Sequence, residues 1–394
     1  MKILHVSTYG DVVPCGIADY TRDLMESLEG KGIIQDNFVL KVSTFTHAKK
    51  EYEKLYAEII EKSKEFDIVH IQHQFGFFRT GKHYIDTLMG FFKFLEKLKA
   101  KKVFVTFHTE PLFYKNFVKV KKTKFKRFIY RLRLNYQWKK LLSLCKEMEE
   151  KGNGKFNFVA HNELVTKSLL TLGFSLKCIH QVFLPVKIIQ NRAIETSYFQ
   201  EKIKNFKKEN EVLVGIIGFL EAHKGIGELI EAVRVLPRNY KLVLCGGQRI
   251  AGDSQFLETV RKQIYTNVFL KNRVLITGYV PEGELHYCFD LIDIFAFPYH
   301  GFFASSSAAI GLACQAQKPI ITSRIKCFEE ITKVYNCFEM VSAHTSYELA
   351  DAIQRISSNK EKAKELVSNI RKFVDENHWE VSSQKFMSFY QKVG

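Results

Sequence analysis

Residues 212–226 read VLVGIIGFLEAHKGI, and this stretch decides the fold. The run rich in Val and Ile predicts a buried strand over 212–218, and residues 225–236 have the spacing of a helix. Between them lies a tight loop that ends in Lys224-Gly225 at the mouth of the helix. A lysine there supplies a positive charge for a diphosphate, and a glycine lets the backbone approach closely.

The same alternation of strand and helix runs through the whole chain. Short β-branched or aromatic runs predict strands at 2–7, 38–45, 67–73, 102–108, 156–160, 178–184, 212–218, 240–245, 274–277, 294–298, 319–322 and 338–341. Helical patterns such as 254–263 separate them, which is typical of βα units and parallel sheets. We therefore expect an α/β fold of two doubly wound, Rossmann-like domains. Such domains bind ligands at the carboxyl ends of their strands, which would face each other across a cleft.

The length of 394 residues also favours two domains rather than one core. The polar segment 188–210 has no deep apolar period, so we place the boundary there and expect domains at 1–187 and 188–378. Residues 379–394 carry Val381, Phe386, Phe389 and Tyr390 at helical spacing. This pattern predicts an amphipathic helix that packs back on the first domain.

Composition excludes several classes of protein. The chain is 46% hydrophobic and 26% charged with 22 Gly and 7 Pro, which excludes disordered and collagen-like proteins. The formal net charge of +17 predicts attraction to phosphates, anionic lipid or nucleic acid, without choosing among them. The eight cysteines form no CxxC pair, as is usual for reduced thiols in a cytosolic protein, and predict neither a disulfide framework nor a zinc site.

Two further features concern location. The N-terminus begins with a strand-like run and has no apolar signal region, so we expect a cytoplasmic protein. Residues 294–317 contain no Asp, Glu, Lys or Arg and are long enough to cross a bilayer. Pro298 and the serines at 305–307 would place polar and helix-breaking groups in its middle, so we interpret this segment as strand, loop and buried helix.

Several polar residues follow predicted strands in the first half. Gly16 opens a helix after the first strand, where backbone N–H groups could approach a phosphate, although a plain strand-to-helix turn explains it equally well. The loop is not GxGxxG, which disfavours an NAD enzyme. His108 and Glu110 leave the fourth strand, where they could hydrogen-bond a sugar. His70 and His73 should face opposite sides of one strand, which argues against a two-histidine metal site, and only His73 lies near the carboxyl end.

In the second half, Ser305, Ser306 and Ser307 follow a predicted strand at a helix start. Their hydroxyls and the free N–H groups of the helix could hold an anion, although one serine would serve as an ordinary N-cap. There is no convincing Asp-x-Asp clamp at a strand end, so we expect no metal and no other cofactor.

These segments carry a resemblance to glycosyltransferases of the GT-B fold, and most of all to family GT4, the retaining nucleotide-sugar transferases. The resemblance covers nearly the whole chain in order and spacing, and its matching segments are the opening strand with its glycine loop, 107–109 (FHT), 218–225 (GFLEAHKG), 244–247 (LCGG), 278–285 (GYVPEGEL) and 313–321 (ACQAQKPII).

The resemblance implies roles for the candidate residues. His108 would contact the donor sugar, and Lys224 with Gly225 would hold the diphosphate of a UDP- or GDP-linked sugar; these residues and Gly16 form the expected catalytic and donor set. Main chain around Tyr279 and Val280 would read the base, and the serines 305–307 would replace a glutamate loop. The first domain would bind a glycan or lipid-linked acceptor through His73 and Glu110, and the second would bind the donor.

Three positions depart from the family pattern. Phe219 replaces an arginine, and Ala304 and Leu312 stand at the positions of two glutamates. These losses keep two alternatives open. The chain could be a catalytically silent partner subunit that binds nucleotide or glycan, or an epimerase or phosphorylase on the same scaffold.

The segment between Glu110 and Glu147 has no acidic residue and alternates cations with aromatic residues. The cations are Lys115, Lys119, Lys121, Lys122, Lys124, Lys126, Arg127, Arg131, Arg133, Lys139 and Lys140. Each cation near an anionic leaflet contributes about 1 kcal/mol, and aromatic residues suit the interface. We expect peripheral binding to an anionic membrane, with a solvated basic helix pair as the alternative. No recognisable nucleic-acid module accompanies the charge, so no nucleic-acid partner is expected.

Overall fold

The computed structural model describes residues 1–8, 15–40, 49–78, 84–112, 124–189, 197–248, 254–301 and 306–392, without the side chains of 49, 50, 124–131 and 254. The chain forms two compact units, each described below by itself. Unit 1 holds residues 1–183, 303–306 and 382–394, and unit 2 holds 184–302 and 307–381. Both are α/β units with parallel sheets, which confirms the predicted fold class.

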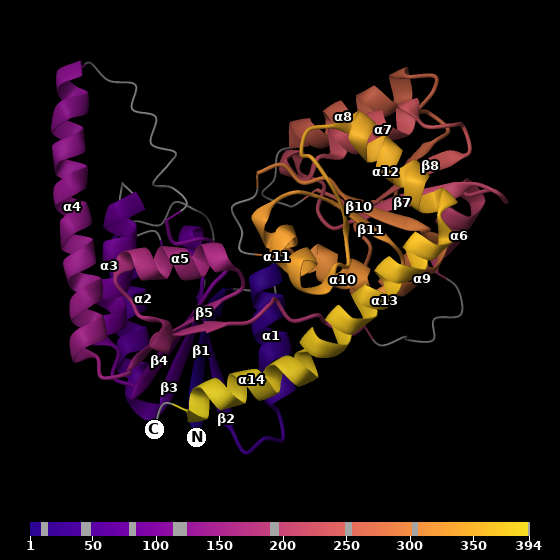
Figure 1. Cartoon of the computed structure of the whole chain (residues 1–394). Coiled ribbons are helices and arrows are strands. Elements are labelled where there is room, and N and C mark those ends of the chain that lie inside the picture. Colours follow the sequence, from indigo (N-terminus) through magenta and orange to yellow (C-terminus); the bar gives the residue numbers. More distant parts are fainter. Residues whose placement is uncertain are drawn as a thin grey trace. The chain divides into compact units, whose positions relative to one another are not determined.

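Unit 1 is built on a six-stranded parallel sheet of order β2-β1-β3-β4-β5-β6. Its strands are β1 (Lys2–Thr8), β2 (Ile34–Leu40), β3 (Ile68–His73), β4 (Lys102–Phe107), β5 (Phe156–Ala160) and β6 (Ile179–Gln181). Its helices are α1 (Gly16–Leu28), α2 (Lys49–Lys62), α3 (Tyr84–Lys97), α4 (Lys124–Lys151) and α5 (Glu163–Leu172), with short 3-10 turns η1 (Ser63–Glu65), η2 (Phe75–Phe78) and η4 (Leu176–Cys178). Figure 1 shows α1 and the C-terminal helix α14 (Trp379–Gln391) on one side of this sheet and α3 with α4 on the other.

The two faces of the unit 1 sheet have different chemistry. On the α3 face, Phe107 of β4 and His73 of β3 pack against Phe91 of α3, and this face belongs to a large aromatic and aliphatic core. On the opposite face, β3 and β4 present His70 and Thr106, which hydrogen-bond to each other at 2.8 Å. Successive side chains on a strand alternate between faces, so residues 70 and 73 point to opposite sides, as predicted.

The C-terminal helix α14 (Trp379–Gln391) covers the polar face of unit 1. It begins in unit 2 and belongs to unit 1 from Ser382 onward. Its buried Tyr390 donates or accepts a 2.7 Å hydrogen bond with His70 Nδ1, and Phe386 packs on the same imidazole. Lys31, after α1, hydrogen-bonds to the Ser383 hydroxyl. These contacts confirm the predicted helix that crosses back to the first unit.

Unit 2 repeats the architecture with the order β12-β11-β10-β7-β8-β9. Its strands are β7 (Val212–Ile217), β8 (Tyr240–Cys245), β9 (Val274–Ile276), β10 (Ile294–Phe297), β11 (Ile320–Ser323) and β12 (Glu339–Val341). Its helices are α6 (Tyr198–Phe206), α7 (Ile226–Val235), α8 (Ser254–Thr266), α9 (Leu285–Leu291), α10 (Ala308–Gln315), α11 (Lys326–Tyr335), α12 (Ser346–Ser358) and α13 (Lys360–Asn377), with 3-10 turns η5 (Ala222–Lys224) and η6 (Glu282–Glu284). α7 and α12 cover one face and α10 and α13 the other (Figure 1).

The structure corrects two predicted segments. Strand β2 starts at Ile34 rather than at 38, because this edge strand pairs with β1 through its backbone and carries polar side chains that the apolar pattern missed. Residues 41–48 lie outside the described residues. The polar segment 188–210 contains helix α6, whose N-cap Ser197 accepts a hydrogen bond from Gln200 N–H. Ile203 is the residue of this helix that is completely buried, so the helix packs mainly through one apolar side chain and shows no apolar period in the sequence.

The segment 294–317 forms strand β10 and helix α10 in its described parts, as predicted. No helix within the described ranges is both long enough and apolar enough to cross a bilayer. All eight cysteines are free thiols, and seven of them are buried.

Candidate active site

The strand order of unit 2 brings two connections together at one edge of the sheet. β7 pairs in parallel with β10, and the chain winds outward from these two strands in opposite directions. Doubly wound sheets bind ligands at such a reversal, outside the carboxyl ends of the strands. The connection from β7 to α7 contains Lys224, and the connection from β10 to α10 contains the serines 305–307. The topology therefore places the connections that carry these two sequence motifs after neighbouring strands, at the same edge of the sheet.

The two connections touch through their backbones. The His300 N–H donates to the carbonyl oxygen of His223 at 2.8 Å. Gly225 has a φ of +68°, in the left-handed region, and a Cβ added there would stand 2.0 Å from the Pro298 carbonyl oxygen. Only glycine meets both conditions without strain. This close approach holds the neighbouring Lys224 against the end of β10.

Lys224 closes η5 and is only 9% exposed. Its Nζ lies 5.9 Å from the ring centroid of Tyr299 and 3.2 Å from the place that a Cβ would take at Gly218. The Cβ of Ala309, in the first turn of α10, is 3.4 Å from that same place. The ammonium group therefore lies near the start of α10, where unpaired N–H groups form the positive end of the helix. A cation and a helix start side by side make an anion site.

The serines at this helix start are placed only in part. Ser307 is the N-cap of α10, but its side chain makes no capping hydrogen bond, and its hydroxyl lies 3.4 Å from the Tyr299 hydroxyl. It therefore does not act as an ordinary capping serine. Ser306 is half-buried next to it, and Ser305 lies outside the described residues, as does Ala304.

An aromatic pair lies beside the same loop. The Tyr279 side chain is 55% exposed, and its ring stacks with Phe219 at 6.4 Å between centroids and 25° between planes. Leu220 N–H donates to the Gly247 carbonyl oxygen at 2.9 Å, which ties the β7 loop to the end of β8. Val280, next to Tyr279, is buried. The residue that replaces the family's arginine thus forms an aromatic surface with an expected base-binding residue.

In unit 1, His108 follows β4 on the face that α1 and α14 cover. Its N–H donates to the His73 carbonyl oxygen at 3.0 Å, which continues the β3–β4 pairing by one residue. Its Nε2 lies 2.9 Å from Gln72 Oε1, and the Tyr20 ring meets the imidazole edge-on at 4.8 Å. Since a carbonyl oxygen only accepts, Nε2 carries the proton and leaves Nδ1 as a hydrogen-bond acceptor.

The surroundings of His108 also determine its charge. Burial holds the pKa of this imidazole well below its usual value, and the neighbouring His161 and His73 lower it further. The ring is therefore neutral near pH 7. A neutral imidazole can accept a hydrogen bond from a sugar hydroxyl but cannot supply a fixed positive charge to phosphate.

The structure places the other unit 1 candidates less favourably. His73 is 2% exposed and packs against Phe78, Phe91 and Phe107, and burial lowers its pKa to about 3. Its environment is that of a core residue, and we do not retain it as an acceptor-binding residue.

Glu110 is half-buried, and its Oε1 accepts a hydrogen bond from Ser168 of α5 at 2.9 Å. Gly16 is exposed at the start of α1, and no described residue lies within 4 Å of an added Cβ there. Contacts with the described part of the chain therefore do not require glycine at position 16.

The sequence reasoning missed three side chains that shape these sites. Gln72 orients His108, Tyr20 packs on it, and Tyr299 lies between Lys224 and Ser307. Tyr299 follows a predicted strand and could have been found on that ground. The partners of His108 come from another strand and from a helix, so no local pattern marks them.

Comparison with known proteins agrees with this architecture. Residues 198–373 match the family described as "Glycosyl transferases group 1". A structure of Anabaena Alr3699/HepE in complex with UDP and glucose is similar, with a TM-score of 0.68 and 15% identity over 98% of each chain. Sucrose-phosphate synthase from Thermosynechococcus elongatus gives a TM-score of 0.71 and 15% identity over 100% of this chain and 99% of that one.

WaaG, a glycosyltransferase involved in lipopolysaccharide biosynthesis, gives a TM-score of 0.60 and 13% identity over 99% of this chain and 100% of that one. A search of curated proteins gave no match. The family match supports the transferase expectation. Residues 198–373, which contain Lys224, match the group 1 glycosyltransferase family and support a glycosyltransferase, and the likeness to solved structures over both units shows the GT-B fold.

Proposed function

We propose that this chain transfers a sugar from a UDP-linked donor, with retention of anomeric configuration and without a metal in the chemical step, as a member of family GT4. The observation that carries the proposal is the position of the Lys224 ammonium group beside the start of α10 at the strand reversal of unit 2. The similar Anabaena structures contain UDP or UDP-glucose, which favours UDP over GDP.

The donor would bind along the edge of unit 2. Lys224, Gly225 and the serines 305–307 would hold the diphosphate. The exposed face of Tyr279 would pack on the base, beside the main chain of Val280. Gly16 at the start of α1 would supply further N–H groups.

The chemistry needs stabilisation of the leaving group. As the bond between the anomeric carbon and the β-phosphate oxygen breaks, negative charge grows on the diphosphate. Lys224 and the N–H groups of α10 are fixed before the reaction, so they stabilise that charge without reorganisation. The acceptor oxygen bonds to the anomeric carbon on the same face, and its proton passes to the departing phosphate. No dedicated protein base is required.

His108 would address the sugar, because its neutral ring offers an acceptor nitrogen to a hydroxyl. Glu110 is the retained candidate for acceptor binding. We propose a glycan or lipid-linked acceptor, and the likeness to WaaG, which acts in lipopolysaccharide biosynthesis, supports the lipid-linked kind.

A lipid-linked acceptor fits a membrane-facing helix α4. In its described part, Arg133, Lys139 and Lys140 are exposed together with Leu132 and Tyr136, so cations and apolar groups share this surface. Lys115, Lys119, Lys121 and Lys122 lie outside the described residues, as do the side chains of Lys124, Lys126, Arg127 and Arg131. We propose peripheral association with the cytoplasmic face of an anionic membrane, with no nucleic-acid partner.

Two experiments test these proposals. A panel of UDP- and GDP-sugars, screened by thermal shift and then offered with glycan and lipid-linked acceptors, should identify a UDP-sugar that both stabilises the protein and yields product. Binding without product from any acceptor would contradict the transfer reaction proposed here.

The membrane proposal is tested by sedimentation with vesicles. The protein should co-sediment with anionic vesicles but not with neutral ones, and salt should release it, because exposed charges are screened within about 8 to 10 Å. Replacing Arg133, Lys139 and Lys140 with Gln should weaken sedimentation, and adding Lys121, Lys122, Lys124, Lys126 and Arg127 to the set should abolish it. Equal behaviour with both vesicle types would return α4 to the solvated-helix interpretation.

A further inference from the structure

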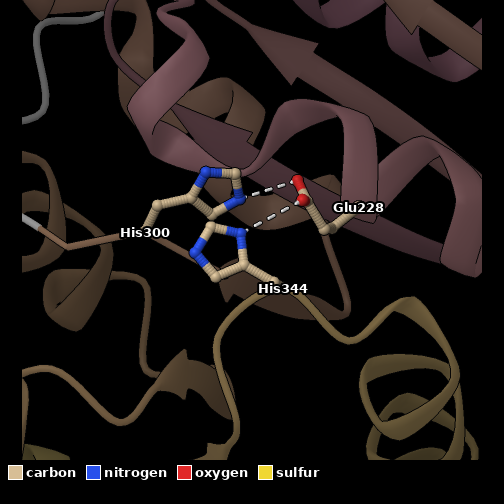
Figure 2. A group of neighbouring side chains, drawn as sticks. All are labelled: Glu228, His300 and His344. Carbon is tan, nitrogen blue, oxygen red and sulfur yellow. Dashed lines mark ion pairs between the residues drawn. The ribbon is translucent and has the colours of Figure 1, made fainter.

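Three side chains from separate connections of unit 2 converge beside the proposed phosphate site. Glu228 lies in the first turn of α7, and His300 follows β10. His344 lies in the connection between β12 and α12. Figure 2 shows both imidazoles turned toward the two oxygens of the carboxylate. None of the three was singled out by the sequence.

The donor atoms of this cluster are close together. His300 Nε2 is 2.9 Å from one Glu228 carboxylate oxygen, and His344 Nδ1 is 3.7 Å from the other. The two imidazole rings lie 3.8 Å apart between centroids, at 36°. One ligand atom from each residue lies within 4.8 Å of the other two. Tetrahedral ligands of a zinc ion stand about 3.4 Å apart, given bond lengths of about 2.1 Å, so a small closure would complete the site.

This closure requires movement of the His344 side chain, while Glu228 and His300 can stay in place. The His344 side chain is 62% exposed, so it can shift toward the others. Glu228 and His300 are 23% and 24% exposed. The backbone N–H of His300 is fixed to the His223 carbonyl oxygen, and α7 packs on α12, the helix that follows His344. Two ligands are thus held by the fold, and the third can move.

Two further observations concern the residues of this cluster. His300 Nε2 is buried and lies 2.9 Å from a Glu228 oxygen without making a hydrogen bond to it, so the two groups form an ion pair only when the imidazole is protonated. A neutral imidazole would place its ring nitrogen against the carboxylate without a hydrogen bond, and a metal ion between the two groups would satisfy both. In addition, His344 has a φ of +65°, which is uncommon for a residue other than glycine.

The donor set limits what the ligand can be. Two imidazole nitrogens and one carboxylate suit a first-row transition metal and leave a coordination position open. Ca²⁺ and Mg²⁺ prefer sets made of oxygen atoms, so this donor set disfavours these ions. An organic anion is disfavoured because the cluster contains a carboxylate.

We infer that Glu228, His300 and His344 form a Zn²⁺ site. The ion would join the start of α7 to the connections that follow β10 and β12. His300 opens the segment that leads to Ser306 and Ser307, so the ion would fix the start of that segment against the Lys224 loop. Its role is to order these connections, and the transfer chemistry itself does not use it. The inference concerns unit 2 by itself and does not depend on the proposed function.

The test uses the full chain without an affinity tag, stripped of metal with EDTA. Zn²⁺ titrated into the protein should bind at one equivalent and raise the Tm. Co²⁺ in its place should give the visible absorption of a four-coordinate site. Glu228→Gln and His344→Ala should each weaken Zn²⁺ binding by at least about tenfold. His286→Ala is the matched control, because this half-buried histidine of unit 2 lies in α9, outside the cluster, and its loss should change nothing.

Circular dichroism of each stripped variant establishes that it is folded before metal is added. Absence of a Zn²⁺-dependent rise in Tm in the unmodified chain would overturn the inference, as would equal affinity in Glu228→Gln and His344→Ala. That result would leave a metal-free ion pair. Lys224→Ala separates this inference from the proposed function, since it should weaken UDP binding while Zn²⁺ affinity stays unchanged.

Discussion

The polar face of the unit 1 sheet and the connections after β7 and β10 in unit 2 hold their candidate site residues in different ways. Unit 1 buries His70, Gln72 and Thr106 of two adjacent strands and half-buries His108 after the second strand, so its chemistry depends on neutral side chains. Unit 2 places Lys224 next to Gly225 and its ammonium group close to Gly218, so its chemistry depends on backbone shape and one charge. From this difference we expect the stability of unit 1 to depend on pH. We expect the stability of unit 2 to depend on the volume of the side chains near Lys224.

The largest expected effect is the loss of stability of unit 1 in acid. Burial lowers the pKa of His5 and His161 from 6.5 to about 4, and that of His73 to about 3. Above pH 6.5 these imidazoles are neutral in both folded and unfolded chains, so stability is fully present. Below it the unfolded chain binds protons that the folded chain does not. Stability should therefore fall by about 1.4 kcal/mol per pH unit for each such histidine, and the loss should end near the folded pKa values.

Urea unfolding at pH 7, 6, 5 and 4, followed by hydrogen exchange resolved along the chain, would measure this loss in unit 1. His73→Met removes one titrating group and keeps the site apolar, so the slope between pH 6 and 4 should decrease by about 1.4 kcal/mol per unit. If the unfolding free energy of His73→Met fell with pH as steeply as that of the unmodified chain, His73 would not contribute to the acid sensitivity of unit 1.

The next effect concerns volume in unit 2. Gly225→Ala should cost roughly 2–5 kcal/mol of unfolding free energy, because a left-handed non-glycine residue and an overpacked contact each contribute. The contact is with the Pro298 carbonyl oxygen. Gly227→Ala is the control, because this residue lies in the first turn of α7, which Gly225 caps, and no described residue lies within 4 Å of an added Cβ there. It should be neutral or stabilising, and equal losses in both variants would contradict the role of close approach.

A smaller effect concerns the charge. Lys224→Ala should weaken UDP binding by about 1.5–3 kcal/mol, the range for a hydrogen bond to a charged group. Calorimetry would measure it, with Lys204→Ala as a control at an exposed lysine of α6 in the same unit. Unchanged affinity in a folded Lys224→Ala variant would remove the diphosphate role.

The smallest effect concerns the sugar. His108→Ala should lower kcat by about tenfold, which corresponds to about 1.4 kcal/mol, while UDP affinity stays near that of the unmodified chain. Gln72→Leu should reproduce part of this loss, because it removes the acceptor that fixes the imidazole. Activity within a factor of about two in His108→Ala would show that the ring is structural.

Local sequence patterns predicted strands accurately where burial of apolar side chains alone determines the strand. The strands at 156–160 and 240–245 were predicted to the residue, because both are continuous buried runs in a parallel sheet. Strand β2 was misplaced because an edge strand needs only backbone pairing, and helix α6 was missed because its apolar face is nearly a single residue.

The candidate site likewise contains features that the sequence predicted and features that it did not. The Lys224-Gly225 pair was visible in the sequence because a helix start after a buried strand is a local signal. The approach of Pro298 to Gly225, the orientation of His108 by Gln72 and the convergence of Glu228, His300 and His344 were not visible. Each joins separate strands or connections, and nothing in the spacing along the chain records which connections meet.

The sequence by itself thus determined the alternation of strands and helices, the two-unit organisation and the residues that follow each strand. Hydrophobic period and glycine placement are local, and they act through burial and backbone sterics. Only the tertiary structure decided which of those residues are buried and neutral and which meet across neighbouring connections. Strand order sets those neighbours, and it follows from the packing of the whole sheet rather than from any one segment.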